Sequence, residues 1–141
     1  MAYFWHIAND TEFNDIYSFL LNSPVKDQWG EDDVRRRVVV PLFLGQLVLF
    51  TNDDGKICGM ITIGFMSPEA AAHEGTIGVQ NEDWRSGDQL WVVDFVANDG
   101  GGAAMLRLLT RAMNKEKWGE VKYYRLKHHQ VREVRPCQAV K

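Results

Sequence analysis

The chain has 141 residues, 45% of them hydrophobic and 25% charged, and a formal net charge of −3. This length fits one domain, so we expect a single domain over residues 1–141, and the composition excludes a disordered chain. The longest apolar run, residues 38–44, is far shorter than the ~18 residues that cross a bilayer, which excludes a transmembrane helix. The N-terminal residues lack the pattern of a secretory signal, and with two cysteines we expect a cytoplasmic protein whose thiols stay reduced.

The hydrophobic pattern predicts two helices before the first strand. Apolar residues recur at helical spacing over residues 13–21, which indicates an amphipathic helix that ends near Pro24. A second helix should begin near Gly30, because three acidic residues follow it and suit the positive end of a helix dipole. We expect Pro41 to end or kink this second helix.

The remainder of the chain predicts strands around one further long helix. In chain order, the expected elements are a β-hairpin of residues 47–51 and 56–65, a short helix at 69–73, a central strand at 89–97, a helix that follows three glycines and ends at Gly119, and a strand at 121–127. A hairpin joined to a strand–helix–strand unit is typical of an α/β or α+β domain in which helices flank a mixed sheet.

Three consecutive glycines, Gly100, Gly101 and Gly102, separate the central strand from the long helix. Glycines let backbone N–H groups turn toward a ligand, and a helix N-terminus adds partial positive charge, so this loop could hold a phosphate. The pattern is neither G-x-G-x-x-G nor a Walker loop, which argues against dinucleotide and P-loop sites. A flexible turn without a ligand is the alternative interpretation.

The central strand carries one carboxylate, Asp94, among bulky apolar residues. A buried charge costs several kcal/mol unless it is paired or hydrogen-bonded, so such a residue is usually bound to a specific partner. Asp94 is therefore either a catalytic carboxylate or one half of a structural ion pair.

Basic residues gather near the C-terminus. Residues 107–141 contain ten of the sixteen Lys and Arg and three of the nineteen Asp and Glu. Arg107, Arg111 and Lys115 follow one another four residues apart and form one stripe of the predicted helix. Such a stripe attracts an acidic partner or is simply solvated surface, and the acidic remainder of the chain makes nucleic acid an unlikely partner. No histidine or cysteine spacing predicts a metal site.

The segment EDWRSGDQLWVVD holds the most specific pattern of the sequence. It resembles the signature of the RTX toxin-activating lysine acyltransferases, in which E-D-W-x-S-G-D leads into a strand that reads W-x-x-D. The coinciding positions are Glu82, Asp83, Trp84, Ser86, Gly87, Asp88, Trp91 and Asp94. The resemblance extends more thinly from about residue 22 to residue 136. It implies one acyltransferase-like domain with the fold of the GCN5-related N-acyltransferases, a mixed central sheet flanked by helices.

The resemblance also implies a reaction. Members of that family transfer a fatty acyl group from acyl-carrier protein to lysine side chains of a protoxin. The donor is the carrier's acyl-phosphopantetheine, and no tightly bound cofactor is implied. Its pantetheine arm would lie between splayed central strands, with Gly100 to Gly102 near its phosphate and Asp94 as a catalytic residue. We expect the stripe of Arg107, Arg111 and Lys115 to dock the acidic carrier.

The family's catalytic histidine is missing, since Lys26 occupies its place after Ser23-Pro24. An unperturbed lysine, with a pKa of about 10.4, is charged at neutral pH and cannot accept a proton as histidine does. Three explanations stay open: a histidine from elsewhere replaces it, Lys26 is itself acylated, or the activity is lost. The histidines in question are His6, His73, His128 and His129.

Loss of activity would make the chain a catalytically silent relative. Such a protein would bind partners, form homo-oligomers or be associated with a phage virion. A small-molecule acetyltransferase that uses acetyl-coenzyme A is a third possibility, but residues 98–103 lack the R/Q-x-x-G-x-G/A loop of that class.

Overall fold

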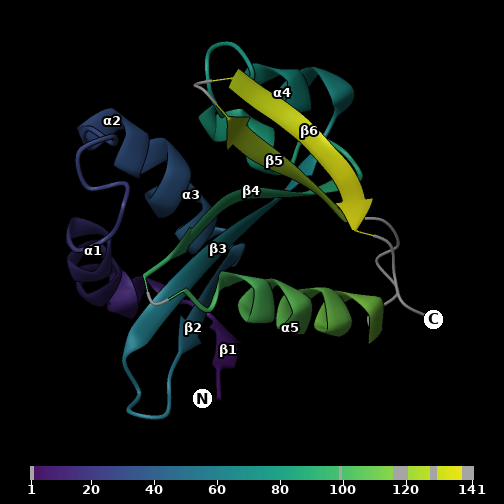
Figure 1. The fold of residues 1–141 in the computed structure, drawn as a ribbon. Helices are drawn as coiled ribbons and strands as arrows, with labels where there is room; N and C mark the ends of the chain where they lie inside the picture. The colour runs from purple at the N-terminus through teal and green to yellow at the C-terminus, as the bar shows by residue number, and fades with distance from the viewer. Residues whose placement is uncertain (1, 99, 116–120, 128–129, 138–141) are drawn as a thin grey trace.

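A computed structural model describes residues 2–98, 100–115, 121–127 and 130–137, and side chains as far as residue 112. One six-stranded sheet with the strands in sequence order organises this part of the chain (Figure 1). The strands are β1 (Phe4–Ile7), β2 (Leu47–Thr51), β3 (Ile57–Met66), β4 (Gln89–Ala97), β5 (Val121–Lys127) and β6 (Gln130–Cys137). The β4–β5 pair is parallel and the other pairs are antiparallel. The predicted mixed sheet is confirmed, with two additional strands, β1 and β6.

The helical elements flank this sheet. They are η1 (Asp10–Glu12), α1 (Phe13–Leu21), α2 (Glu31–Val34), η2 (Arg35–Val39), α3 (Val40–Phe43), α4 (Pro68–His73), η3 (Asn81–Trp84) and α5 (Gly102–Lys115). Helix α1 has the predicted bounds, whereas the expected end of α5 at Gly119 lies outside the described residues. No described helix is long and apolar enough to span a bilayer.

Different helices cover the two faces of the sheet (Figure 1). Alternation along β2 sends Val48 and Phe50 into a cluster with Met105 of α5, while Leu47 and Leu49 pack with α1 and with Leu42 of α3. Helix α5 therefore covers one face, and the helices that precede β2 cover the other.

Pro41 lies within a helix rather than at its end. Elements α2, η2 and α3 form one uninterrupted helical segment, and η2 is a π-helical turn in which the Val40 N–H donates to the Arg35 carbonyl five residues earlier. Proline has no N–H, and its ring clashes with the carbonyl four residues before it. The wider π turn is how the helix continues past Pro41.

Strands β4 and β5 pair over a short stretch. Their register joins Leu90, Trp91 and Val92 to Val121, Lys122 and Tyr123, and no described pair joins them beyond Val92. The second half of β4 thus has no neighbour on its β5 side in the described part of the chain.

Candidate functional site

A cavity of about 600 Å³ opens beside this second half of β4. It lies between β4, the helical segment of α2 and η2, and the loop that follows α4. The lining residues are Val25, Gln28, Trp29, Asp33, Arg36, Arg37, Glu74, Gly75, Thr76, Ile77, Gly78, Val93, Asp94, Phe95 and Val96. Asp94, predicted to be a functional carboxylate, therefore faces a cavity.

A β-bulge decides the side of the sheet on which Asp94 lies. Val92 is opposite Ile63 and Asp94 is opposite Thr62, so Val93 is an extra residue in β4. Ile63 and Val92 belong to the cluster beneath α5. Without the bulge, alternation would place Asp94 on that same apolar face, two residues after Val92. Because of the extra residue, the Asp94 side chain lies on the opposite face of the sheet, toward η2.

Arg37 of η2 is the ion partner of Asp94. Its Nη1 donates to both carboxylate oxygens of Asp94, at 3.2 and 3.1 Å. The same guanidinium binds Glu74 just after α4, with Nη1 donating to Oε2 at 3.0 Å and Nη2 to Oε1. The side chains of Arg37, Glu74 and Asp94 are 14%, 7% and 15% exposed. Two largely buried carboxylates therefore share one cation.

This environment perturbs the proton affinity of Asp94. Burial raises the pKa of its carboxyl, the Arg37 guanidinium opposes that rise, and the negative charge of Glu74 adds to it, which places the pKa at about 6. Burial acts to lower the pKa of Arg37, but its hydrogen bond to Glu74 and the charge of Asp94 outweigh burial and raise it. Arg37 stays charged, and Asp94 titrates close to neutral pH.

Trp84 of the signature holds the turn that carries Arg37. Since Val40 donates to Arg35 and Pro41 has no N–H, the Arg36 carbonyl has no helical donor at either the α or the π spacing. The Trp84 indole Nε1 donates to this carbonyl at 2.9 Å, and the Trp84 side chain is fully buried. The Trp84 indole N–H thus replaces the main-chain donor that Pro41 lacks.

Other signature residues anchor the loop from which Glu74 comes. The buried Asp83 accepts from the Gln80 N–H at 2.7 Å, and its Oδ2 lies 2.8 Å from His73 Nδ1. A Cβ on Gly87 would lie 2.5 Å from the main-chain nitrogen of Ser67, so only glycine fits there. These signature positions build the frame of the site, while Asp94 alone among them lines its cavity.

The other predicted catalytic residue, Lys26, lies at the edge of this cavity. It is exposed in the turn after α1, and its neighbours Val25 and Gln28 line the cavity. The described residues place Arg37, not Lys26, against Asp94. Of the four histidines, His6 contacts Glu12, His73 contacts Asp83, and the pair at 128–129 lies outside the described residues.

The predicted glycine loop lies between this cavity and a second one of about 550 Å³. A Cβ on Gly102 would lie 3.2 Å from Phe95 of the first cavity, and one on Gly101 would overlap Tyr3 of the second. Gly100 has a φ of 78°, the left-handed conformation that favours glycine.

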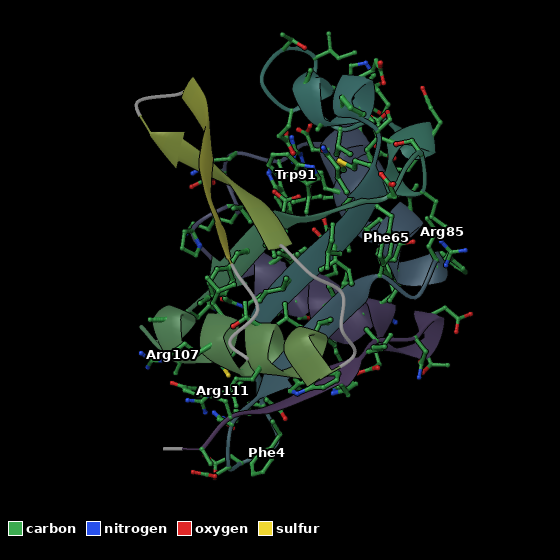
Figure 2. The ribbon with its side chains drawn as sticks, turned by 90° about the vertical axis from the view of Figure 1, so that its right-hand side faces the viewer. Phe4, Phe65, Arg85, Trp91, Arg107 and Arg111 are labelled. Carbon is green, nitrogen blue, oxygen red and sulfur yellow. The ribbon has the colours of Figure 1, made fainter. Side chains whose placement is uncertain are left out.

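The second cavity is where the predicted basic stripe lies. Arg107 and Arg111 are exposed on α5 and line it together with Tyr3. Figure 2 shows both arginines toward the end of the molecule where Phe4 of β1 lies, with Trp91 toward the other end. The side chain of Lys115 is outside the described part.

Sequence reasoning missed Arg37, Glu74 and the role of Trp84. The run Arg35–Arg37 just before Pro41 was a usable signal, because a proline inside a helical pattern predicts a local break in the helix ladder. Glu74 gave no signal, since nothing local distinguishes it from a solvated glutamate.

The sequence matches a known protein family over most of its length. The model of the RTX toxin acyltransferase family (HlyC) matches residues 8–137. The chain belongs to this family. A curated relative, the RTX-II toxin-activating lysine-acyltransferase ApxIIC of Actinobacillus pleuropneumoniae, is 25% identical over 88 residues, which cover 61% of this chain and 54% of the relative. The chain thus matches about half the length of that member of the RTX toxin acyltransferase family.

Solved structures of the GNAT fold are similar to this RTX toxin acyltransferase family member. The mosquito arylalkylamine N-acetyltransferase like 5b has a TM-score of 0.62 and 13% identity, over 87% of this chain and 76% of that one. The GphF GNAT-like decarboxylase in complex with isobutyryl-CoA has a TM-score of 0.61 and 14% identity, over 89% and 67%. The loading GNATL domain of CurA from Lyngbya majuscula has a TM-score of 0.60 and 14% identity, over 89% and 66%. The predicted fold class is confirmed.

Proposed function

We propose that the chain is a protein-lysine N-acyltransferase that takes a fatty acyl group from acyl-carrier protein. The observation that carries the proposal is Asp94, a largely buried carboxylate with a pKa raised to about 6, which faces a cavity beside the half of β4 that no described residue pairs on its β5 side. Membership of the RTX toxin acyltransferase family and the similarity to ApxIIC, a toxin-activating lysine-acyltransferase, support the same reaction class.

The donor arm has a natural place along β4. Beyond Val92 this strand has no described partner on its β5 side, and an extended chain can add to such an edge through main-chain hydrogen bonds. The GphF GNAT-like decarboxylase, which has a similar fold, was solved in complex with isobutyryl-CoA, an acyl thioester on the same kind of arm. We place the thioester of the carrier's phosphopantetheine in the cavity next to Asp94.

The carrier would dock at the other end of this path. Arg107 and Arg111 are exposed and could attract an acidic carrier protein through long-range charge. In the glycine loop, Gly101 lies next to Tyr3 of the second cavity and Gly102 next to Phe95 of the first, so the arm would pass along this loop. Gly100, Gly101 and Gly102 would then lie beside the phosphate of the arm.

Asp94 would act as the general base. The lysine amine attacks the thioester carbonyl carbon and the C–N bond forms, while Asp94 takes a proton from the attacking nitrogen. The C–S bond then breaks, and the proton held by Asp94 passes to the leaving thiolate, which restores the carboxylate. With a pKa of about 6, Asp94 is mostly ionised above pH 7 and is a better proton acceptor than an ordinary aspartate. This role does not require the missing histidine.

Lys26 has a place in the proposal at the rim of the cavity. Its neighbours Val25 and Gln28 line the cavity, and its own side chain is exposed, so we place Lys26 next to the acyl group that the cavity would hold. It would assist Asp94 or become acylated itself. Peptide mapping of the reacted protein, together with Lys26→Ala, separates the two roles.

The test is acyl transfer measured by intact mass. Fatty-acylated carrier protein is mixed with the chain and with lysine-containing acceptor proteins, an RTX toxin among them, and an acceptor should gain one acyl mass. Asp94→Asn should lower the rate by a factor of about 100 or more, whereas Asp54→Asn in the exposed hairpin turn serves as a matched control. Absence of transfer together with absence of carrier binding would overturn the proposal.

The docking face has its own test. Arg107→Glu combined with Arg111→Glu should weaken carrier binding, and the wild-type affinity should fall as salt shortens the Debye length, about 10 Å at 0.1 M. Lys56→Glu, an exposed position in the hairpin, is the control. Unchanged binding by the double variant would show that the carrier docks elsewhere.

A further inference from the structure

Two carboxylates compete for the Arg37 guanidinium, and they are not bound alike. Glu74 accepts from both terminal nitrogens, one for each of its oxygens, in the forked geometry that suits Arg–carboxylate pairs. Asp94 is bound through Nη1 alone, at 3.1 and 3.2 Å. Glu74 therefore holds the stronger share of the cation, and Asp94 keeps part of its capacity to accept a proton.

Among the described residues, the other charged groups around Asp94 add no second cation to it. On α2, Asp33 faces the site and is matched by Arg36, with Arg36 Nη2 3.0 Å from Asp33 Oδ1. On β3, the group next to Asp94 is the uncharged hydroxyl of Thr62, which accepts a hydrogen bond from the Asp94 main-chain N–H at 3.1 Å. Within the described residues around Asp94, one guanidinium thus serves two carboxylates.

The position of Glu74 is fixed by the signature loop. It caps the C-terminal end of α4, directly after His73, whose ring contacts the buried Asp83. Helix α4 begins at Pro68, and its N-cap is Ser67, the main chain of which packs against Gly87. The family signature therefore holds Glu74 in place at one end of Arg37, while its Trp84 holds the helical turn at the other.

We propose that Glu74 is a positioning residue of the site: by binding both terminal nitrogens of Arg37, it leaves Asp94 bound through Nη1 alone and so able to take the proton of the acceptor amine. This inference rests on the proposed acyl transfer. It assigns a role to a residue outside the signature and to an ion pair that would otherwise be only structural. Removal of the Glu74 charge should let Arg37 turn both nitrogens to Asp94 and hold it as a non-basic carboxylate.

The experiment measures the proton affinity of Asp94 directly. Aspartate carboxyl groups are labelled with carbon-13, and the Asp94 resonance, assigned with Asp94→Asn, is titrated by NMR in wild type and in Glu74→Gln. The Asp94 midpoint should fall by about one pH unit in the variant, since an opposite charge in full contact lowers a carboxyl pKa by 1–3 units. The acid limb of the transfer rate against pH should shift by the same amount. Glu69→Gln, an exposed position on the same helix, should leave both unchanged.

The outcomes separate this inference from the proposed function. A shift of the Asp94 midpoint without any acyl transfer would support the role of Glu74 and overturn the reaction. Transfer with the same midpoint in wild type and Glu74→Gln would overturn the role of Glu74 and keep the reaction. If Glu74→Gln does not fold, the wild-type titration decides, because a wild-type Asp94 midpoint at or below the ordinary aspartate value of about 3.9 refutes the inference.

Discussion

Trp84→Phe tests whether one indole N–H holds the Pro41-containing helix. The substitution keeps a buried aromatic ring but removes the donor to the Arg36 carbonyl, which has no helical donor at the α or the π spacing. A buried carbonyl left unsatisfied costs about 1–3 kcal/mol. The smaller ring also leaves a void in a fully buried position, at a further cost of about 1 kcal/mol. We expect the free energy of unfolding to fall by about 2–4 kcal/mol in total.

Trp91→Phe is the matched control, because Trp91 lies in the same buried cluster and its Nε1 donates to the Gln89 side chain at a longer 3.3 Å. Urea titrations followed by far-UV circular dichroism give both free energies of unfolding. Trp84→Phe should be the less stable variant by about 1–3 kcal/mol, the cost of the unsatisfied carbonyl. Equal losses in the two variants would refute the reasoning that Trp84 compensates for Pro41.

Three further predictions follow from the site. Asp94 has a pKa of about 6 in the folded protein, above its ordinary 3.8, so the native state binds a proton more tightly than the unfolded chain and loses stability as pH rises from 4 to 6. The free energy of unfolding of Asp94→Asn minus that of wild type should therefore grow over this pH range, and a flat difference would contradict the raised pKa. Arg37→Gln removes the cation from two largely buried carboxylates, so the free energy of unfolding should fall by about 3–5 kcal/mol at pH 7.5 and by less at pH 5, where a carboxylate takes up a proton. Thermal unfolding at both pH values measures these losses, and equal losses would contradict the prediction. Gly87→Ala should lower the free energy of unfolding by more than about 1 kcal/mol, because the new Cβ would lie 2.5 Å from a main-chain atom. Gly75→Ala, with its nearest atom at 3.7 Å, should change the free energy of unfolding by less than about 1 kcal/mol, and similar melting temperatures of the two variants would show that the loop around residue 87 relaxes.

Local pattern in the sequence determined most of the elements that hold the site. The apolar spacing of residues 13–21 predicts a helix, and the Asp54-Gly55 turn between two largely apolar runs predicts a hairpin, because each depends on neighbours along the chain. The same holds for β4, whose bounds match the prediction. Strand β1 was missed because all four of its residues are exposed, so it shows no alternation of buried and exposed positions.

The sequence also determined that Asp94 needs a partner, and the signature around it determined the family. A carboxylate among bulky apolar residues cannot stay charged and alone without a large free-energy cost. That reasoning holds for any fold, which is why it could be made before the structure was known. It could not say which cation would meet Asp94.

Tertiary structure decided the rest of the site. The bulge at Val93 sends Asp94 to the side of the sheet where η2 lies, and the parity of a strand cannot be read from its sequence when the extra residue is itself apolar. Arg37 is 57 residues from Asp94 and 37 from Glu74 along the chain, so no local pattern links them. Only the packing of the helical segment against β4, with Trp84 bonded to the Arg36 carbonyl of its π turn, buries Asp94 beside Glu74 and Arg37. Burial and the negative charge of Glu74 raise the pKa of Asp94, while Arg37 opposes that rise.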